Sequence, residues 1–272
     1  MKRVAILGSP VTGALSPVIH RAAYEELGLD WKYEAVECAE SGLERFLEGV
    51  RADESWAGLS LTMPLKRAAP AYLDEISELV AMTGAANTVT VRGGRLLGEN
   101  TDVVGMERAI KAVSDGRPGS VAILGAGATA ATALCVARGF GIRDALIVTR
   151  DLDRVGAIRA AAERMDVRLQ LAPWSEARTA FGRDLAISAL PPFAADDLGS
   201  GELDGFTGLL LDVAYRPSPT RLVQHARDAG AVAVTGLSML VHQAVRQLEL
   251  QVGAAVKAPY DRMLRAAREA LQ

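Results

Sequence analysis

The stretch GAGATA, residues 125–130, carries the most specific chemical pattern in the sequence. It matches G-x-G-x-x-A, follows an apolar strand-like segment and opens an Ala-rich helical segment, which is the setting in which this motif binds a dinucleotide. Gly125 would permit the tight turn, and Gly127 would let a pyrophosphate reach bare amides at the helix N-terminus. We therefore predict a dinucleotide site that includes Ala126 and Ala128, with a glycine-lined packing turn as the alternative.

The end of the next strand-like segment could distinguish two dinucleotides. This segment, ALIVTR (145–150), ends in Thr149 and Arg150, and Asp151 and Arg154 follow. An acid at this place binds the ribose 2′-hydroxyl of NAD, whereas an arginine accommodates the 2′-phosphate of NADP. We predict NADP, bound through Thr149, Arg150 and Arg154, because a planar guanidinium suits a phosphate. Asp151 keeps NAD open as the alternative cofactor.

Three polar clusters lie at the ends of strand-like segments in the first hundred residues. They are GALSP (13–17), SLTMPLK (60–66) and the pair AANT and ENTD within 85–102. Open α/β sheets place their ligand crevices at the carboxyl ends of strands, so we expect these clusters to converge. Their hydroxyl and amide groups could hold several hydroxyls of a small polyol acid.

Two residues of these clusters, Lys66 and Asp102, could hold or move a proton. Taken alone, Lys66 is typical of a solvated lysine at a helix start. Asp102 precedes an apolar series at helical spacing, Val103, Met106 and Ile110, so capping a helix is its ordinary interpretation. Neither residue by itself predicts catalysis.

The elements that must position these residues alternate between strand and helix. Strands are expected at 3–8, 32–37 and 56–61. A helix with Ser16 as its N-cap should end at Gly28, and a capping box at 41–44 should open another. A third helical stretch carries Ile76, Leu79 and Val80. The glycine pair at 93–94 predicts a tight hairpin within 87–100.

From residue 119 onward the alternation continues. Further strands are expected at 145–150, 167–171, 184–190, 208–215 and 231–235, and helical stretches at about 238–252 and 260–271. Strand–helix alternation predicts parallel sheets. Seams near residues 105 and 236 would give an α/β fold of two lobes with a cleft between them.

Composition excludes several classes of function. The chain has 272 residues, a net charge of −3 and 23% charged residues, so no basic field is available for nucleic acid or an anionic membrane. The start has only a short apolar run, which predicts neither a signal peptide nor a membrane span. Cys38 and Cys135 lie far apart and suit a reducing cytosol. The three scattered histidines predict no metal site. We expect a cytoplasmic protein, monomeric or homodimeric, that acts on a small molecule.

Seven motifs together carry a resemblance to a known family. They are LSP, LTMPLK, GAANT, ENTD, GAGATA, VTR and GLSMLVHQAV, in this order over essentially the whole chain. The chain resembles the shikimate dehydrogenases, which use NADP to interconvert 3-dehydroshikimate and shikimate in aromatic biosynthesis. The resemblance implies that the closing helices return to the first lobe. It thus implies a substrate-binding and catalytic domain, 1–105 plus 237–272, and a Rossmann NADP-binding domain, 106–236.

The resemblance also implies roles for single residues. Lys66 and Asp102 match the family's catalytic pair: Lys66 would give a proton to the nascent alkoxide or take it back, and Asp102 would orient it. Substrate binding is implied for Ser16, Ser60, Thr62, Asn87, Tyr215 and Gln243. The resemblance also implies that Gly236 binds the cofactor.

The chain departs from the family pattern at five positions. These are Gly13, where histidine is common, Ala14, where serine is usual, Ser60, often asparagine, Val103, usually glycine, and Asp151, usually a small polar residue. Ala14 removes a hydroxyl expected at the substrate carboxylate. A quinate/shikimate dehydrogenase preferring NAD is therefore the first alternative, and a non-catalytic dinucleotide-binding regulator is a more remote one.

Overall fold

The computed structural model describes all 272 residues, and the chain divides into two compact units. The first unit comprises Met1–Gly105 and Val241–Gln272, and the second comprises Met106–Leu240. Both divisions fall inside helices, α4 (Thr101–Lys111) and α8 (Gly236–Val252). The second division follows Leu240. No helix is both long and apolar enough to cross a bilayer.

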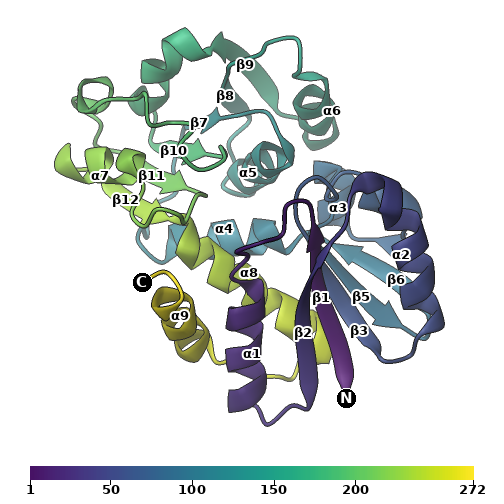
Figure 1. Cartoon of the computed structure of the whole chain (residues 1–272). Helices are drawn as coiled ribbons and strands as arrows, with labels where there is room; N and C mark the ends of the chain where they lie inside the picture. The colour runs from purple at the N-terminus through teal and green to yellow at the C-terminus, as the bar shows by residue number, and fades with distance from the viewer. The chain divides into compact units, whose positions relative to one another are not determined.

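The first unit is built on a six-stranded sheet with the order β2-β1-β3-β5-β6-β4 (Figure 1). The strands are β1 (Lys2–Gly8), β2 (Trp31–Glu37), β3 (Trp56–Leu61), β4 (Glu75–Ile76), β5 (Thr88–Arg92) and β6 (Arg95–Glu99). β1, β2 and β3 run parallel, and β5 pairs antiparallel with both β3 and β6. Gly93 and Gly94 both have positive φ and close the expected hairpin.

Helices cover both faces of this sheet. They are α1 (Ser16–Glu26), α2 (Glu40–Ala52), α3 (Glu78–Thr83), the start of α4, most of α8, and α9 (Tyr260–Glu269). On one face, Leu43, Leu47 and Val50 of α2 pack with Leu7 and Leu59 of the sheet, because these positions fall on one side of the helix. α1 and α9 lie side by side (Figure 1).

Three local predictions in this unit are wrong. Leu15, not Ser16, is the N-cap of α1, and α2 begins at Glu40 after Ala39, so the capping box at 41–44 does not form. Ile76 belongs to the short strand β4, since the third helix starts only after Ser77. Its side chain is 46% exposed. The Ser77 hydroxyl accepts a hydrogen bond from the Val80 amide and caps that helix at 3.3 Å.

The second unit is a fully parallel sheet with the order β12-β11-β10-β7-β8-β9. Its strands are β7 (Val121–Leu124), β8 (Asp144–Thr149), β9 (Arg168–Pro173), β10 (Leu185–Ser188), β11 (Leu209–Asp212) and β12 (Val232–Thr235), and its helices include α5 (Ala128–Gly139), α6 (Gly156–Met165) and α7 (Arg221–Asp228). β7, β10 and β11 are buried throughout, as expected for strands covered on both faces. The chain turns back between β7 and β10, which is the doubly wound Rossmann order. The predicted α/β class is confirmed.

Candidate active site

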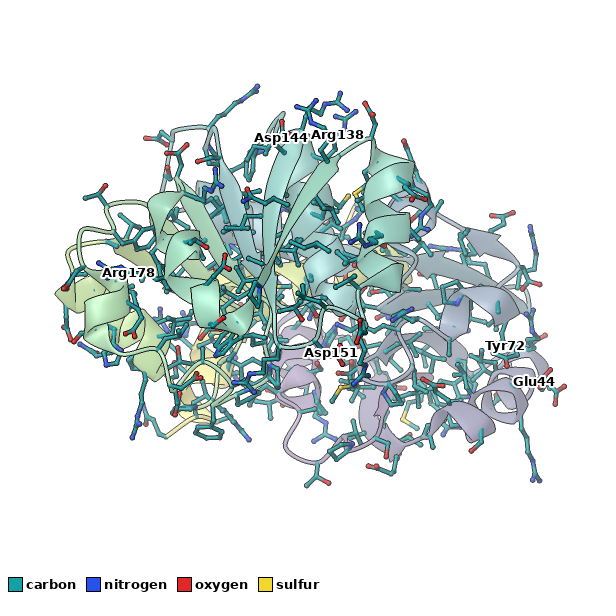
Figure 2. The ribbon with its side chains drawn as sticks, turned by 90° about the horizontal axis from the view of Figure 1, so that it is seen from above. Glu44, Tyr72, Arg138, Asp144, Asp151 and Arg178 are labelled. Carbon is teal, nitrogen blue, oxygen red and sulfur yellow. The ribbon has the colours of Figure 1, made fainter.

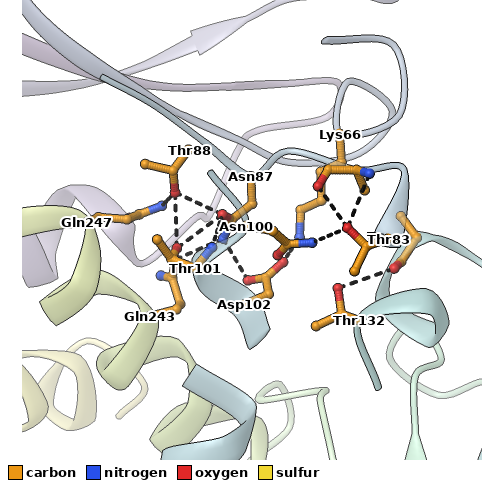
Figure 3. Close-up of polar contacts among 12 residues, drawn as sticks. Lys66, Thr83, Asn87, Thr88, Asn100, Thr101, Asp102, Thr132, Gln243 and Gln247 are labelled. Carbon is orange, nitrogen blue, oxygen red and sulfur yellow. Dashed lines mark hydrogen bonds and ion pairs between the residues drawn. The ribbon is translucent and has the colours of Figure 1, made fainter. Parts of the chain in front are cut away.

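The Lys66 amine and the Asp102 carboxylate meet in the first unit. Lys66 follows β3, and Asp102 lies in the first turn of α4. Lys66 Nζ donates to Asp102 Oδ2 at 2.7 Å, with side chains 21% and 9% exposed (Figure 3). Asp102 follows the first helical residue, Thr101, so it is not the N-cap. The amine and the carboxylate thus form a charge-assisted, largely desolvated pair.

Asn87 holds the other oxygen of Asp102. It precedes β5, and its Nδ2 donates to Asp102 Oδ1 at 2.9 Å and to Gln243 Oε1 at 3.3 Å (Figure 3). Its Oδ1 accepts from the backbone N–H of Thr101 at 2.7 Å. A backbone N–H can only donate, so this bond fixes which end of the Asn87 amide faces the carboxylate. Asp102 therefore accepts hydrogen bonds on both oxygens.

α8 contributes two glutamines to the same group of residues. Gln243 Oε1 also accepts from the Thr101 hydroxyl at 3.3 Å. Gln247, one turn further along, donates through Nε2 to Thr88 Oγ1 at 3.0 Å. Both glutamines are buried, at 5% and 1% exposure. Residues more than 140 positions apart in the chain are thereby joined.

Ser60 and Ser16 lie beside a buried tyrosine. The Tyr33 hydroxyl donates to Ser60 Oγ at 2.6 Å, and Ser60 Oγ donates to Gln247 Oε1 at 3.1 Å. Burial raises the pKa of Tyr33, against the opposing effect of hydrogen bonds with Ser60 and Ser16, so the phenol stays protonated and able to donate. The His20 ring stacks on the Tyr33 ring with centroids 4.4 Å apart. Nδ1 of His20 contacts the Ser16 carbonyl at 2.9 Å.

Two other polar residues of the first unit have different settings. Thr62 is half-buried just after β3, and its backbone N–H donates to the Leu7 carbonyl at 2.9 Å. Asn100, expected to converge with the others, donates instead to Thr83 Oγ1 at 3.0 Å (Figure 3). Thr83 in turn donates to the Leu79 carbonyl at 2.7 Å. Asn100 therefore joins the end of β6 to α3.

The glycine turn of the second unit lies at the carboxyl end of β7, at the point where the strand order reverses. Gly125 has a φ of +110°, and a Cβ there would lie 3.2 Å from the Ala189 carbonyl oxygen, so glycine is required. Nothing lies within 4 Å of a Cβ built on Gly127. Gly127 is the N-cap of α5 and makes no side-chain capping bond, so the first amides of the helix, at Ala128 and beyond, have no side-chain acceptor from a cap. These features suit a pyrophosphate.

Arg150 follows β8 directly and is held by three neighbours. Its guanidinium donates to the Ala194 carbonyl, lies 5.0 Å from the centroid of the Trp174 ring and approaches Asp197 at 3.9 Å. Thr149 is buried, whereas Arg154 is exposed. Asp151 lies at the opposite end of β8 from Asp144 (Figure 2). Its Oδ1 accepts from the Asp153 amide at 2.9 Å, so this acid is engaged in a local turn.

Two predicted residues lie near the carboxyl end of β11. Tyr215 is half-buried, and burial raises the pKa of its phenol. Asp212 is buried and accepts from Thr220 Oγ1 at 2.7 Å, which ties together the two ends of the segment that carries Tyr215. Gly236 opens α8, and a Cβ there would lie 2.0 Å from the Val213 carbonyl oxygen. Gly236 thus allows two backbones to approach closely.

Two comparisons with known protein sequences match the same family. A family model described as the shikimate dehydrogenase substrate binding domain matches residues 6–89. The chain is 36% identical over 286 residues to the shikimate dehydrogenase (NADP(+)) of Symbiobacterium thermophilum, covering 99% of this chain and 94% of that protein. The chain belongs to the shikimate dehydrogenase family.

Solved structures of shikimate dehydrogenases have the same fold. The Thermus thermophilus shikimate 5-dehydrogenase, in complex with NADP(H) and shikimate, matches with a TM-score of 0.87 and 33% identity over 100% of both chains. The Mycobacterium tuberculosis shikimate dehydrogenase matches with a TM-score of 0.85 and 32% identity over 99% of both chains.

The sequence did not predict three residues that are hydrogen-bonded around Asn87 and Ser60. They are Gln247, Tyr33 and Thr88, the last of which lies in the AANT cluster but has no predicted role of its own. One signal was available: Gln243 and Gln247 are four residues apart, so they share one face of a largely apolar helix. Tyr33 gave no such signal, because a tyrosine in a strand is ordinary.

Proposed function

We propose that this chain catalyses the NADP-dependent, reversible reduction of 3-dehydroshikimate to shikimate. The observation that carries the proposal is the 2.7 Å contact between Lys66 Nζ and Asp102 Oδ2. It occurs in a chain 36% identical to a shikimate dehydrogenase over nearly its whole length. A lysine is a poor core residue, so its partial burial against a carboxylate is more useful for chemistry than for stability.

In the proposed reaction Lys66 handles the proton. It gives a proton to the oxygen of the carbonyl being reduced, and takes one from the hydroxyl in the reverse direction. Asp102 keeps the amine directed toward that oxygen and accepts a hydrogen bond from a substrate hydroxyl. Asn87 supports Asp102 from the other side through the 2.9 Å bond to Oδ1.

The remaining polar residues are proposed to bind the substrate. Ser16 would meet the carboxylate of the acid, and the ring hydroxyls would be held by the other members of the set. These are Ser60, Thr62, Asn87, Tyr215 and Gln243. Ala14 supplies no hydroxyl to the carboxylate, so Ser16 would carry more of that contact than it does where serine is present.

The residues of the second unit fit an NADP molecule. The uncapped N-terminus of α5 and the open space at Gly127 would take the pyrophosphate, and Thr149, Arg150 and Arg154 would take the adenosine 2′-phosphate. NADPH, when bound, supplies the hydride. We propose Ala126, Ala128 and Gly236 as further contacts. The proposed preference for NADP over NAD rests on the charge and planar fork of Arg150 at the end of β8, which suit a 2′-phosphate.

A panel of initial rates tests the proposed function. Purified protein should be assayed with shikimate and with quinate, each with NADP and with NAD. We expect the highest kcat/KM with shikimate and NADP. If quinate with NAD gives the highest value, the alternative suggested by Ala14 and Asp151 is preferred. Tight NADPH binding without turnover of either acid would favour a non-catalytic regulator.

We further propose that the protein works in the cytoplasm. Cys38 and Cys135 are both buried, and neither forms a disulfide. Cysteines that form no disulfide are ordinary in a reducing compartment and uncommon in secreted proteins.

A further inference from the structure

A continuous series of hydrogen bonds joins Tyr33 to the Lys66–Asp102 pair. Tyr33 donates to Ser60 at 2.6 Å, Ser60 to Gln247 at 3.1 Å, and Gln247 to Thr88 at 3.0 Å. Thr88 Oγ1 then donates to Asn87 Oδ1 at 2.8 Å. Asn87 completes the series through its bond to Asp102 Oδ1 (Figure 3).

Burial makes this series a defined arrangement. Tyr33 and Thr88 are fully buried, and Gln247 and Ser60 are 1% and 3% exposed. A buried polar group that loses its partner cannot turn to water instead, so each side chain is held by the next. The side-chain amides of Gln247 and Asn87 do not readily pass protons. The series therefore orients groups rather than conducting a proton.

Gln251 shows that burial on α8 does not by itself create such contacts. Gln243, Gln247 and Gln251 are spaced by four residues and lie on one face of the helix. Gln251 is 6% exposed, yet both its amide nitrogen and its amide oxygen lack a partner. Gln247 is bonded at both ends. The two residues thus differ in their contacts but share helix, face and burial.

We propose that Tyr33, Gln247 and Thr88, together with Ser60 in addition to its proposed contact with the substrate, are positioning residues for the reaction, because they keep the Asn87 amide nitrogen within hydrogen-bond distance of Asp102. This inference rests on the proposed function of the Lys66–Asp102 pair. Without the Thr88 hydroxyl, the bond from the Thr101 backbone N–H is what still holds Asn87 Oδ1, and the side chain can tilt away from the carboxylate. A displacement of about 1 Å at a reacting group costs up to about 100-fold in rate.

Two substitutions of Thr88 separate positioning from packing. Thr88→Val keeps the side-chain volume and removes the hydroxyl, whereas Thr88→Ser keeps the hydroxyl and removes a methyl group. If Thr88 only packs, valine is harmless and serine is the damaging change. If Thr88 positions Asn87, we expect T88V to lower kcat by about 10–100-fold and T88S to restore most of it. The KM for NADP should stay unchanged in both.

Gln247→Met and Gln251→Met form a matched pair on α8. Q247M should lower kcat by about tenfold or more, while Q251M should stay within about twofold of wild type. Equal kcat values for T88V and T88S, or equal losses in Q247M and Q251M, would overturn the inference. Circular dichroism of each variant identifies any loss of folding. If T88V does not fold, the comparison of Q247M with Q251M still tests the inference, and if Q247M does not fold, the comparison of T88V with T88S does.

A crystal structure of T88V gives a readout that does not depend on turnover. We expect Asn87 Nδ2 to move away from Asp102 Oδ1. An unchanged separation near the present 2.9 Å would contradict the positioning role whatever the activity. If wild-type protein turned over no shikimate, the proposed function would fail, and this structure would still decide whether the series holds Asn87.

Discussion

Asp102 serves two purposes that a carboxylate near a helix N-terminus can combine. The first turn of α4 carries partial positive charge, which favours an acid there. The same carboxylate accepts hydrogen bonds from Lys66 and Asn87. A substitution at Asp102 would disturb both the helix and the amine, so Lys66 is the more informative position to change.

Removing the Lys66 amine should abolish most of the turnover. For Lys66→Ala we expect kcat to fall by about 10²–10⁴-fold, because a proton-transfer group is lost. NADPH affinity, measured by fluorescence titration, should be unchanged. Lys111→Ala is the control, since Lys111 is an exposed lysine paired with Glu107 on the surface of α4. Near-normal kcat in K66A would remove Lys66 from the mechanism.

His20 gives the protein a pH-dependent stability. Burial lowers the pKa of His20 to about 4, against the opposing effect of its contact with the Ser16 carbonyl. The unfolded chain binds a proton near pH 6.5, so between these values the unfolded state holds more protons than the folded state. The contribution of His20 is complete above pH 6.5 and is lost as the pH falls toward 4.

Replacing His20 should remove this dependence. We expect the free energy of unfolding of the wild type to fall by about 2 kcal/mol more than that of His20→Phe between pH 7 and pH 5. Phenylalanine keeps an aromatic ring against Tyr33. Urea unfolding at several pH values measures the difference. Parallel curves for the two proteins would show that His20 does not titrate in this way.

At the level of elements, the sequence predicts interiors better than ends. The strands and the glycine hairpin follow from apolar runs and from the positive φ that Gly93 and Gly94 permit. The predicted starts of α1 and α2 are wrong because a serine hydroxyl beside a helix is not always used as a cap, and both helices begin without a side-chain cap. Ile76 was assigned to a helix because its spacing fitted, although β6 offers it a strand partner.

Gly236 at the start of α8 should tolerate no side chain. A Cβ would lie 2.0 Å from the Val213 oxygen, which is backbone and cannot rotate away. Gly236→Ala should therefore lower the free energy of unfolding by about 1–3 kcal/mol or more. Gly156→Ala, at the start of α6 with no atom within 4 Å of the new Cβ, should be neutral or stabilising by up to about 1 kcal/mol. Thermal unfolding of both variants makes the comparison, and equal effects would contradict it.

At the level of the whole molecule, sheet geometry made much of the candidate site predictable. Lys66, Asn87 and Asp102 follow or precede strands of one sheet, so their convergence follows from topology. The contacts of Gln247 do not, because a helix 159 positions away from Thr88 can approach a sheet in many ways. The resemblance to shikimate dehydrogenases supplied Gln243, and nothing local in the sequence pairs Tyr33 with Ser60.

The two units differ in when all of their residues have been synthesised. The second unit is contiguous, Met106–Leu240, whereas the first requires Val241–Gln272 in addition to Met1–Gly105. During synthesis the Rossmann sheet can therefore be complete while Asn87 and Thr88 still lack Gln243 and Gln247. Until α8 emerges, the nascent first unit exposes amide and hydroxyl groups that its finished core keeps from water. A chaperone that shields this half during translation would have the most to protect in the interval between residues 105 and 252.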